Sequence, residues 1–290
     1  MIITGDTHGM IDVEKLDKYY DMLKEPLIGD TPGLPFGRQF PGYLLIAGDF
    51  GFIWKSSWFD RKGKADKLPK IDNKDFSTLK QMFDYYPWTT LWIDGNHENF
   101  DVLDNLPVEE RWGGKVSVIT DKCIRLHRGQ VYTINGITFL AMGGAYSVDK
   151  HRRIKGSSWW PQETITEADY LEALKNLAKV DYKVDFVISH TCPSAALKIL
   201  EGTLPKYAVD WWGPKQDDPS CEWLERLRQS ITTNHWVFGH FHTDQNFKLG
   251  DTMFHAKFDT FWDAVYTKKK EEGVDVEDKL LLSMYDMEFA

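Results

Sequence analysis

Five short polar motifs, each following an apolar run, constrain the fold of this chain more than any other feature of its sequence. They are Gly5-Asp6-Thr7-His8-Gly9, Gly48-Asp49-Phe50-Gly51, Gly95-Asn96-His97-Glu98, Ser189-His190-Thr191 and Gly239-His240-Phe241-His242. The apolar runs are short and most are rich in β-branched residues, which is typical of buried strands. Because functional loops of α/β proteins follow the carboxyl ends of strands, the motifs predict one shared site.

The segments around the motifs predict an alternation of strands and helices. Strands are predicted at residues 1–4, 43–47, 90–93, 137–142, 185–189 and 236–238. Apolar residues at helical spacing predict helices at residues 13–23, 76–85, 167–179 and 221–230, with Thr166 as the N-cap of the third. This order is typical of an α/β protein.

One domain is favoured over two, because no internal repeat or low-complexity linker interrupts the chain. Residues 1–265 are assigned to this domain, and residues 266–290 to a C-terminal segment packed on it. The Ile134-Asn135-Gly136-Ile137 stretch predicts a hairpin turn, and hence antiparallel strands in a mixed or second sheet. Residues 51–73 and 193–219 look like irregular insertions, which in a compact domain tend to line or cover a site.

Composition and charge exclude several classes of protein. Apolar residues make up 42% of the 290 residues, enough for a packed core. The formal net charge of −9 argues against non-specific binding to nucleic acid or anionic lipid. The sequence shows neither a signal peptide nor an apolar run near the roughly 20 residues that span a bilayer.

The three cysteines, Cys123, Cys192 and Cys221, are widely spaced and form no Cys-x-x-Cys pair. They predict neither a disulfide framework nor a thiolate metal site, which favours a cytoplasmic location. Cys192 is interpreted as a small buried residue although it lies two positions from His190.

Two of the motifs place possible metal ligands two residues apart. Asp6 and His8 have this spacing, and so do His240 and His242. Alternate side chains of an extended chain point to the same side, so Asp6 and His8 are expected to reach one ion, and His240 and His242 are expected to face the same way. Two such imidazoles can serve two ions about 3.5–4 Å apart, the separation of binuclear hydrolases.

The other motifs add a bridging carboxylate and neutral ligands. Asp49 has two oxygens with which to bridge two ions, and Asn96 and His190 complete a second set. Imidazoles mixed with a few oxygens favour Mn, Fe, Zn, Co or Ni over Mg or Ca. Two divalent ions with two aspartates leave a net charge of about +2, which favours an anionic substrate, above all a phosphate ester.

In order, D-x-H, G-D, G-N-H-[DE], a lone H and G-H-x-H resemble the signature of the calcineurin-like metallophosphoesterase superfamily, from Gly5 to His242. The resemblance implies an α/β (α+β) fold, a four-layer αββα sandwich of two mixed β-sheets flanked by helices. It implies a first ion held by Asp6, His8, Asp49 and His242, and a second held by Asp49, Asn96, His190 and His240. It also implies that His97 protonates the leaving alcohol or stabilises the phosphoryl oxygens.

The second motif departs from the G-D-x-x-D-R-G pattern of the Ser/Thr phosphatases in this superfamily. Here Asp49 is followed by Phe50-Gly51-Phe52-Ile53-Trp54. The chain therefore lacks the Asp that orients the acid histidine in those relatives and the Arg that binds phosphate. Protein phosphatase activity is not favoured, and no residue in the sequence is identified that would orient His97.

A replacement anion clamp is sought in the Gly143-Gly144-Ala145-Tyr146 loop and in Lys150, Arg152 and Arg153. The glycines could expose backbone N–H groups to an anion, and the basic residues could bind substrate. The alternative is a tight turn followed by a solvated basic patch. Glu98 either begins a surface helix or supports the site from behind.

Two tryptophan pairs, Trp159-Trp160 and Trp211-Trp212, offer a further alternative between site and core. They could stack on a nucleobase. Packing in the core or in a lid is the favoured interpretation.

These observations favour a binuclear metal-dependent phosphoesterase that hydrolyses a phosphate mono- or diester by attack of a metal-bridged hydroxide. Two divalent transition metal ions are the expected cofactors, with Mn supporting activity. A nuclease or cyclic-nucleotide-type phosphodiesterase is one alternative, and an inactive scaffold of the same fold is another. The expected partner is a phosphate ester, with nucleic acid only as substrate and no membrane. The physiological substrate, native metal and oligomeric state stay open.

Overall fold

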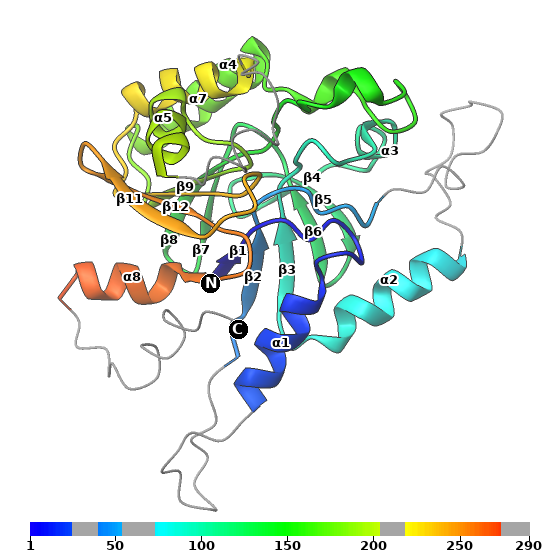
Figure 1. The fold of residues 1–290 in the computed structure, drawn as a ribbon. Helices are drawn as coiled ribbons and strands as arrows, with labels where there is room; N and C mark the ends of the chain where they lie inside the picture. Colours follow the sequence, from blue (N-terminus) through cyan, green and yellow to red (C-terminus); the bar gives the residue numbers. More distant parts are fainter. Residues whose placement is uncertain (25–39, 54–72, 204–217, 274–290) are drawn as a thin grey trace, which may run out of the picture.

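The computed structural model describes residues 1–24, 40–53, 73–203 and 218–273. Within these ranges two mixed β-sheets pack face to face, and helices cover the outer face of each sheet (Figure 1). The layers follow the order αββα, so the predicted fold class is confirmed.

The first sheet contains the three strands that directly precede the first three motifs. Its order is β13 (Trp262–Asp263), β1 (Ile2–Thr4), β2 (Tyr43–Ile46), β3 (Thr89–Trp92), β6 (Cys123–Leu126), β5 (Gly114–Thr120) and β4 (Glu109–Arg111). Strands β1, β2, β3 and β6 run parallel, with Ile3 opposite Leu45 and Leu45 opposite Leu91. The remaining strands pair antiparallel at the two edges. Three motif loops therefore leave neighbouring strands in the same direction.

The second sheet carries the last two motifs. Its order is β11 (Gln245–Leu249), β12 (Thr252–Ala256), β10 (His235–Phe238), β9 (Phe186–Ser189), β8 (Ile137–Met142) and β7 (Gln130–Ile134). Strands β8, β9, β10 and β12 run parallel. The predicted hairpin joins β7 to β8, and both turn residues, Asn135 (φ 53°) and Gly136 (φ 77°), have positive φ.

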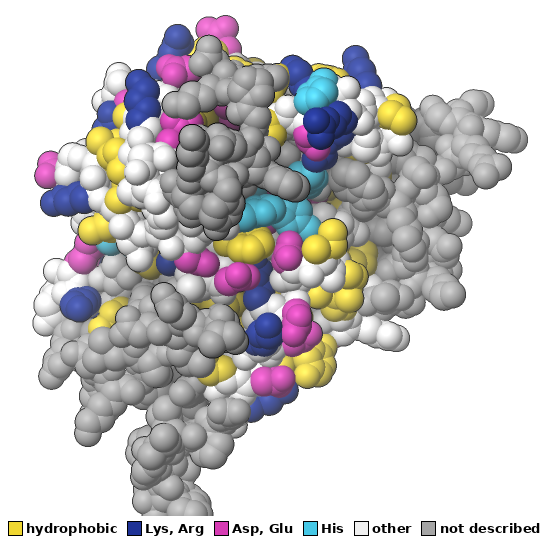
Figure 2. Space-filling model, viewed as in Figure 1, with side chains coloured by type: hydrophobic (Ala, Val, Ile, Leu, Met, Phe, Trp, Pro, Cys, Tyr) yellow, Lys and Arg dark blue, Asp and Glu magenta, His cyan; other side chains and the backbone are white. Residues whose placement is uncertain are grey.

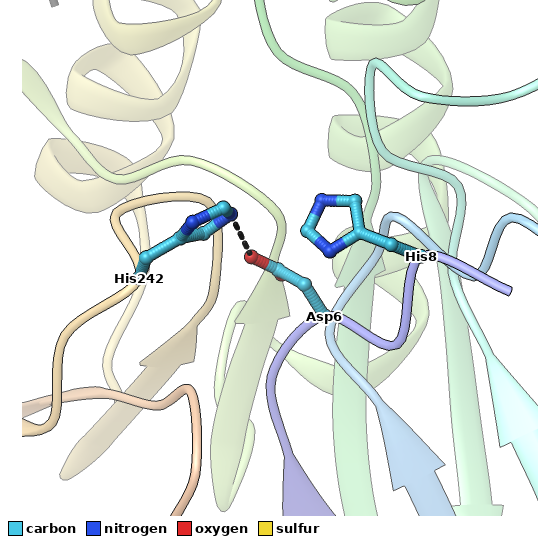
Figure 3. Close-up of side chains that lie close together, drawn as sticks. All are labelled: Asp6, His8 and His242. Carbon is cyan, nitrogen blue, oxygen red and sulfur yellow. Dashed lines mark ion pairs between the residues drawn. The ribbon is translucent and has the colours of Figure 1, made fainter. Parts of the chain in front are cut away.

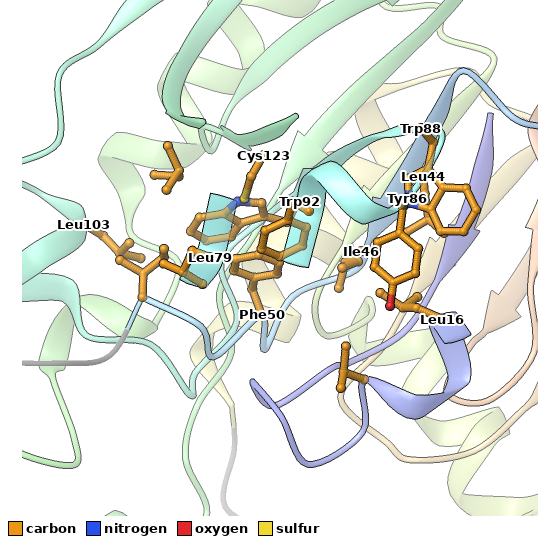
Figure 4. Close-up of a cluster of buried hydrophobic side chains, with 14 of the residues drawn as sticks. Leu16, Leu44, Ile46, Phe50, Leu79, Tyr86, Trp88, Trp92, Leu103 and Cys123 are labelled. Atoms are coloured by element: carbon orange, nitrogen blue, oxygen red, sulfur yellow. The ribbon is translucent and has the colours of Figure 1, made fainter. Parts of the chain in front are cut away.

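The alternation of side chains along the strands builds the core in layers. Leu45 of β2 points into the layer between the sheets, whereas Leu44 and Ile46 point to the helices. On that helical side the rings of Phe50 and Trp92 stack with centroids 4.4 Å apart (Figure 4). The outer layer of the first sheet is formed by α1 (Glu14–Lys24), α2 (Asn73–Tyr85) and α3 (Phe100–Leu103), and that of the second by α4 (Glu167–Leu177), α5 (Ser194–Thr203) and α7 (Pro219–Ser230).

The four predicted helices correspond to α1, α2, α4 and α7, with ends that differ by up to three residues. Thr166 caps α4 as predicted: its hydroxyl accepts from the Asp169 amide, and the Asp169 carboxylate accepts from the Thr166 amide. Helix α4 ends at Leu177, earlier than predicted, and the chain continues as the 3-10 turn η4 (Ala178–Val180).

Part of the insertion predicted as irregular, residues 193–219, is instead helical. Helix α5 forms there because Ala196 and Leu200, four residues apart, pack on the second sheet. The rest of that insertion (204–217) and most of the other (54–72) lie outside the described residues.

Near the C-terminus, α8 (Ala264–Glu271) follows β13 and begins at the Asp263 side-chain cap. The Ala264 amide donates to the Met1 carbonyl (3.1 Å), which joins the start of this helix to the first strand. Residues 274–290 of the predicted C-terminal segment lie outside the described residues, so their packing stays a prediction. Among the helices of the described ranges, none has both the length and the apolar character needed to cross a bilayer.

Candidate metal centre

The five motif loops meet at one edge of the sandwich, where β1, β2 and β3 of the first sheet and β9 and β10 of the second end. Hydrogen bonds join these loops both within the second sheet and between the two sheets. The Gly239 amide donates to the His190 carbonyl (3.0 Å), and His190 Nδ1 lies 2.7 Å from the carbonyl oxygen of Ala47. In Figure 3, Asp6 and His8 from the loop after β1 face His242 from the loop after β10. Figure 2 shows histidine side chains reaching the surface near the middle of this face.

Glycines allow the loops to approach this closely. A Cβ on Gly48 would lie 2.2 Å from Nδ1 of His190, and one on Gly95 would lie 2.0 Å from Oδ1 of Asp49. Gly48 also has a φ of +91°, which favours glycine. The motif glycines are therefore part of the geometry that brings the polar side chains together.

The backbone of the motifs is not extended, and the predicted reason for the two-residue spacing is wrong. His8 (φ 45°), Asp49 (φ 45°), His240 (φ 69°) and His242 (φ 45°) all have left-handed conformations, uncommon for residues other than glycine. The turn after β10 directs His240 and His242 to two different groups of side chains, because the chain does not alternate there as a strand does.

The first group contains Asp6, His8 and His242, whose candidate ligand atoms lie within 4.8 Å of one another. Asp6 is fully buried and lies 3.5 Å from Nε2 of His242, as the dashed line in Figure 3 marks. Nδ1 of His8 lies 2.7 Å from the Asp12 carboxylate, which leaves Nε2 to face the centre. A carboxylate behind a histidine in this way is a common arrangement at metal sites.

The second group contains Asp49, His190 and His240, again within 4.8 Å of one another. Asp49 is also within reach of the first group: its Oδ2 lies 3.2 Å from Nε2 of His8, and its Oδ1 lies 3.2 Å from Nε2 of His190. Asn96 places Oδ1 at 3.1 Å from the same His190 nitrogen. One carboxylate thus faces both groups of ligand atoms.

The donor set around His190 fits a cation. Its Nδ1 donates to the Ala47 carbonyl, so Nε2 of the neutral ring carries a lone pair. That lone pair points at Oδ1 of Asp49 and Oδ1 of Asn96, which are also acceptors. Two buried acceptor oxygens, each about 3 Å from the same nitrogen lone pair, require a positive charge beside that nitrogen. A divalent ion would supply that charge, and in the metal-free protein a proton on Nε2 supplies it.

The charges of these residues shift one another's pKa. Burial alone would lower the pKa of His190, but Asp49 outweighs it and raises the pKa to about 9. At His8, too, burial lowers the pKa but the hydrogen bond and charge of Asp49 outweigh it, and the pKa is raised to about 9. Burial would raise the pKa of Asp49, but His190 and His97 hold it well below its usual range. Metal-free protein at neutral pH therefore holds protons where metal ligands need lone pairs.

His97 lies beside both groups. Its amide donates to Oδ1 of Asp49 (2.7 Å), and its Nε2 lies 4.0 Å from Oδ2 of the same residue. The Arg153 guanidinium contacts the ring, with one nitrogen 3.1 Å from Nδ1 and the other 3.1 Å from Nε2. Burial lowers the pKa of His97, and the Arg153 charge adds to the effect. The group beside His97 is thus the positive charge of Arg153, a residue for which the sequence predicted only substrate binding.

The three basic residues predicted to bind substrate differ in position. Arg153 is half-buried against His97, and its Nε donates to Asp149 (2.7 Å). Lys150 lies with Nζ over the Tyr146 ring, 4.2 Å from its centroid, and Arg152 is exposed. Only Arg153 of these three has a described contact with a motif residue.

The glycine loop after β8 does not form the predicted anion clamp. The Gly144 amide donates to the Asp94 carbonyl (2.8 Å), and the Ala145 amide donates to the Glu163 carbonyl (3.0 Å). These N–H groups are already satisfied within the protein and are therefore not available to an anion. Cys192, as predicted, is a fully buried residue of the core.

Core packing is confirmed for Trp160, which is buried in the hydrophobic cluster between the first sheet and its helices. Trp159 is half-buried and donates to Glu163 (2.7 Å). Trp211 and Trp212 lie outside the described residues.

Glu98 supports the site from behind, and the surface-helix alternative is wrong. Its side chain is fully buried and accepts the amides of Phe50 (2.7 Å) and Gly51 (3.3 Å), in the loop that carries Asp49. Burial raises the pKa of Glu98, and the nearby negative charge of Asp49 raises it further, to about 8. Glu98 thus positions the turn that presents the shared carboxylate.

Several supporting residues were not predicted from the sequence. Asp94, next to the third motif, is fully buried and accepts from Arg125 (2.9 Å) and Arg128 (2.6 Å), which hold its pKa below its usual range. Lys15 of α1 is buried and donates to the carbonyls of Asp6 and Phe258. The only available signals were an arginine within the apolar run of β6 and a lysine on the buried face of α1.

The fold and this centre agree with the family to which the chain can be assigned. Residues 1–244 match the family described as calcineurin-like phosphoesterase. Since the match covers well over half of the 290 residues, the chain belongs to this family. Its class is therefore that of a phosphoesterase hydrolase with groups of candidate metal ligands.

Two solved structures align with most of this chain. Phosphopantetheinyl hydrolase from Mycobacterium tuberculosis is 12% identical, with a TM-score of 0.38, over 88% of this chain and 87% of that one. A putative 5′-nucleotidase from Staphylococcus aureus in complex with alpha-ketoglutarate is 14% identical, with a TM-score of 0.40, over 89% of this chain and 48% of that one. This chain thus spans about half the length of the second protein. Among curated proteins, none matches the chain.

Proposed function

We propose that the protein is a binuclear metal-dependent phosphoesterase that hydrolyses a phosphate mono- or diester. The observation that carries the proposal is the position of Asp49, whose two oxygens each lie 3.2 Å from a histidine of a different group. One buried carboxylate between two sets of ligand atoms is the arrangement that two adjacent divalent ions require.

The proposed ligands follow the two groups of side chains. They are Asp6, His8, Asp49 and His242 for the first ion, and Asp49, Asn96, His190 and His240 for the second. Imidazole with carboxylate and amide oxygens suits Mn, Fe, Zn, Co or Ni, and Mn is proposed as the ion that supports activity. When bound, two such ions supply the Lewis acidity and the activated water that hydrolysis of a phosphate ester needs.

The residues beside the two groups have separate proposed roles. His97 holds a proton near the leaving oxygen, for which its place 4.0 Å from Asp49 is suitable. Arg153 contacts the His97 ring, so a substrate group that reaches His97 also meets the guanidinium. We propose that Arg153 binds a phosphoryl oxygen, in place of the arginine that the second motif lacks. Roles for Lys150 and Arg152 in substrate binding stay predictions.

The Arg153→Ala variant tests this role. We expect kcat/KM to fall about 10- to 100-fold, since a hydrogen bond to a charged group contributes about 1.5–3 kcal/mol. Lys155→Ala removes the same charge from an exposed position of the same loop and is expected to change kcat/KM less than about twofold. Arg153→Lys should recover only part of the activity, because lysine lacks the planar fork. Equal effects of the Arg153 and Lys155 variants would show that only the charge of the loop matters.

Direct assay on metal-reconstituted protein tests the function. With added Mn²⁺ we expect hydrolysis of p-nitrophenyl phosphate, bis-p-nitrophenyl phosphate or both, lost on chelation and restored by metal. A preference for the diester would favour the nuclease or cyclic-nucleotide-type alternative. Protein that binds no transition metal and hydrolyses neither substrate would favour the inactive scaffold. We also propose a cytoplasmic location, supported by three cysteines that are all buried free thiols.

Metal-free protein should lose stability as the pH rises from 6.5 to 9. The pKa of His8 and of His190 is raised from 6.5 to about 9 in the folded metal-free protein, so protonation favours folding. That contribution is fully present below pH 6.5 and is lost as the pH rises through about 9. Thermal unfolding in chelator is the measurement. In excess Mn²⁺ the stabilisation by metal should grow over the same range, because metal displaces these protons. A melting temperature in chelator that stays constant over this range would contradict the prediction.

A further inference from the structure

A buried chain of hydrogen bonds lies behind Asn96, on the side away from His190. Nδ2 of Asn96 donates to Oγ of Ser147 (3.1 Å), and Oγ of Ser147 donates to Oε2 of Glu163 (2.7 Å). The three residues are between 1% and 4% exposed, so water does not compete for these bonds. Glu163 ends the 3-10 turn η3 (Pro161–Glu163), and Ser147 belongs to the loop after β8.

The donor and the acceptor of each of these hydrogen bonds can be assigned by starting from Glu163. Oε1 of Glu163 accepts the Ser147 amide (2.8 Å) and the Trp159 indole N–H (2.7 Å), two groups that can only donate. When Glu163 is ionised, Oε2 can only accept, so the Ser147 hydroxyl hydrogen points to it. The lone pairs of that hydroxyl then accept from Nδ2 of Asn96, which leaves Oδ1 of Asn96 on the side of His190.

We propose that Glu163, acting through Ser147, is the positioning residue that presents the amide oxygen of Asn96 to the second metal ion. The inference rests on the proposed ligand role of Asn96. An amide oxygen binds a cation, whereas an amide NH₂ group does not. The direction of the hydrogen-bond chain therefore decides whether Asn96 is a ligand at all.

The backbone around Glu163 holds the carboxylate in place. Its carbonyl oxygen accepts the Ala145 amide (3.0 Å) and an Arg128 nitrogen (3.0 Å). Arg128 also binds the carboxylate of Asp94, two residues before Asn96. Arg128 therefore links the Glu163 backbone to the segment that carries Asn96, independently of Ser147. Glu163 therefore has little freedom to move away when its side chain is changed.

The Glu163→Gln variant is expected to reverse the direction of these hydrogen bonds, because glutamine has nearly the same shape as glutamate but carries an NH₂ donor. The two N–H donors keep an oxygen at the Oε1 position, so the new NH₂ group takes the Oε2 position and donates to Ser147. The Ser147 hydroxyl is then free to donate to Asn96, whose amide turns and presents NH₂ to His190. Titration of apo-protein with Mn²⁺ by calorimetry should show one of two equivalents bound about 10- to 100-fold more weakly. The matched variant Glu167→Gln, at an exposed position, should bind both equivalents as the wild type does.

The Asn96→Asp change supplies the decisive second background, because both ends of a carboxylate accept. In that background, with Glu163 unchanged, the Ser147 hydroxyl has one hydrogen for two carboxylates. When Glu163→Gln is added, the hydroxyl hydrogen goes to the new carboxylate at position 96, and every group is satisfied. We therefore expect Glu163→Gln to weaken Mn²⁺ binding when residue 96 is Asn and to leave it unchanged or strengthen it when residue 96 has been changed to Asp.

The outcomes separate this inference from the proposed function. Loss of one equivalent in Asn96→Ala, with the predicted reversal in the double variant, supports both. Equal weakening by Glu163→Gln in the two backgrounds, or none in either, overturns the positioning role. Two tight equivalents in Asn96→Ala show that Asn96 is not a ligand, which overturns the ligand assignment and this inference with it. Melting of each variant in chelator identifies any general loss of folding.

Discussion

Replacing Asp49 by Asn is expected to remove most bound metal and to lower kcat/KM by about 10³-fold or more. Asp49 is the carboxylate that faces both groups of ligands, and its burial means that no solvent replaces the lost charge. The magnitude corresponds to the several kcal/mol of charge stabilisation that a bound ion contributes in such reactions. Asparagine keeps the oxygen that accepts the His97 amide, so the loop is expected to fold.

Metal content by elemental analysis and steady-state kinetics are the two measurements for this variant. Asp101→Asn, an exposed change of the same kind at the start of α3, should retain both metal and activity. If Asp49→Asn kept two equivalents of metal and wild-type kcat/KM, the shared carboxylate would not be the bridging ligand.

Replacing His97 by Ala is expected to separate catalysis from metal binding. We expect kcat to fall about 10²–10⁴-fold, because a proton donor is lost, while metal content stays at two equivalents. The loss should be larger for an alkyl phosphate than for p-nitrophenyl phosphate, whose leaving group needs little protonation. His242→Ala, by contrast, should lose an equivalent of metal.

The geometry makes the His97 result informative, because His8, Asp49 and His97 also lie close enough to hold an ion together. Loss of metal in His97→Ala would mean that His97 is a ligand and not the proposed proton donor. Equal losses with alkyl and p-nitrophenyl substrates would point to a role on the phosphoryl oxygens instead.

The strands that carry the motifs were predictable because their signals are local. Each is a buried apolar run that ends in a Gly, Ser or Asp, and the predicted ends differ from the structure by one residue or less for β2 and β9. Two edge strands, β4 and β11, were not predicted. Strand β4 reads Glu-Glu-Arg and β11 alternates half-buried with exposed residues, so neither has an apolar run to indicate it.

The candidate site shows the same division between local and distant information. The motif residues were identifiable because the glycines and the polar side chains stand side by side in the sequence. Arg153 contacts His97 from a position 56 residues further along the chain, and Glu163 bonds Ser147 across 16 residues. No period or spacing indicates such contacts, because they depend on how the loop after β8 returns to the site. The positive φ of His8 and Asp49 was hidden for another reason, since neither residue type requires it.

The origin of the proposed ligands in two different sheets has a mechanical consequence. Asp6, His8 and Asp49 belong to loops of the first sheet, whereas His190, His240 and His242 belong to loops of the second. Between the sheets the contact consists largely of apolar side chains, which resist separation but do not specify how far one sheet can slide over the other. Ions bound by the proposed ligands of both sheets would fix the position of one sheet relative to the other at this edge. Metal loading should therefore slow amide exchange in β2 and β9 together, although no ligand lies within either strand.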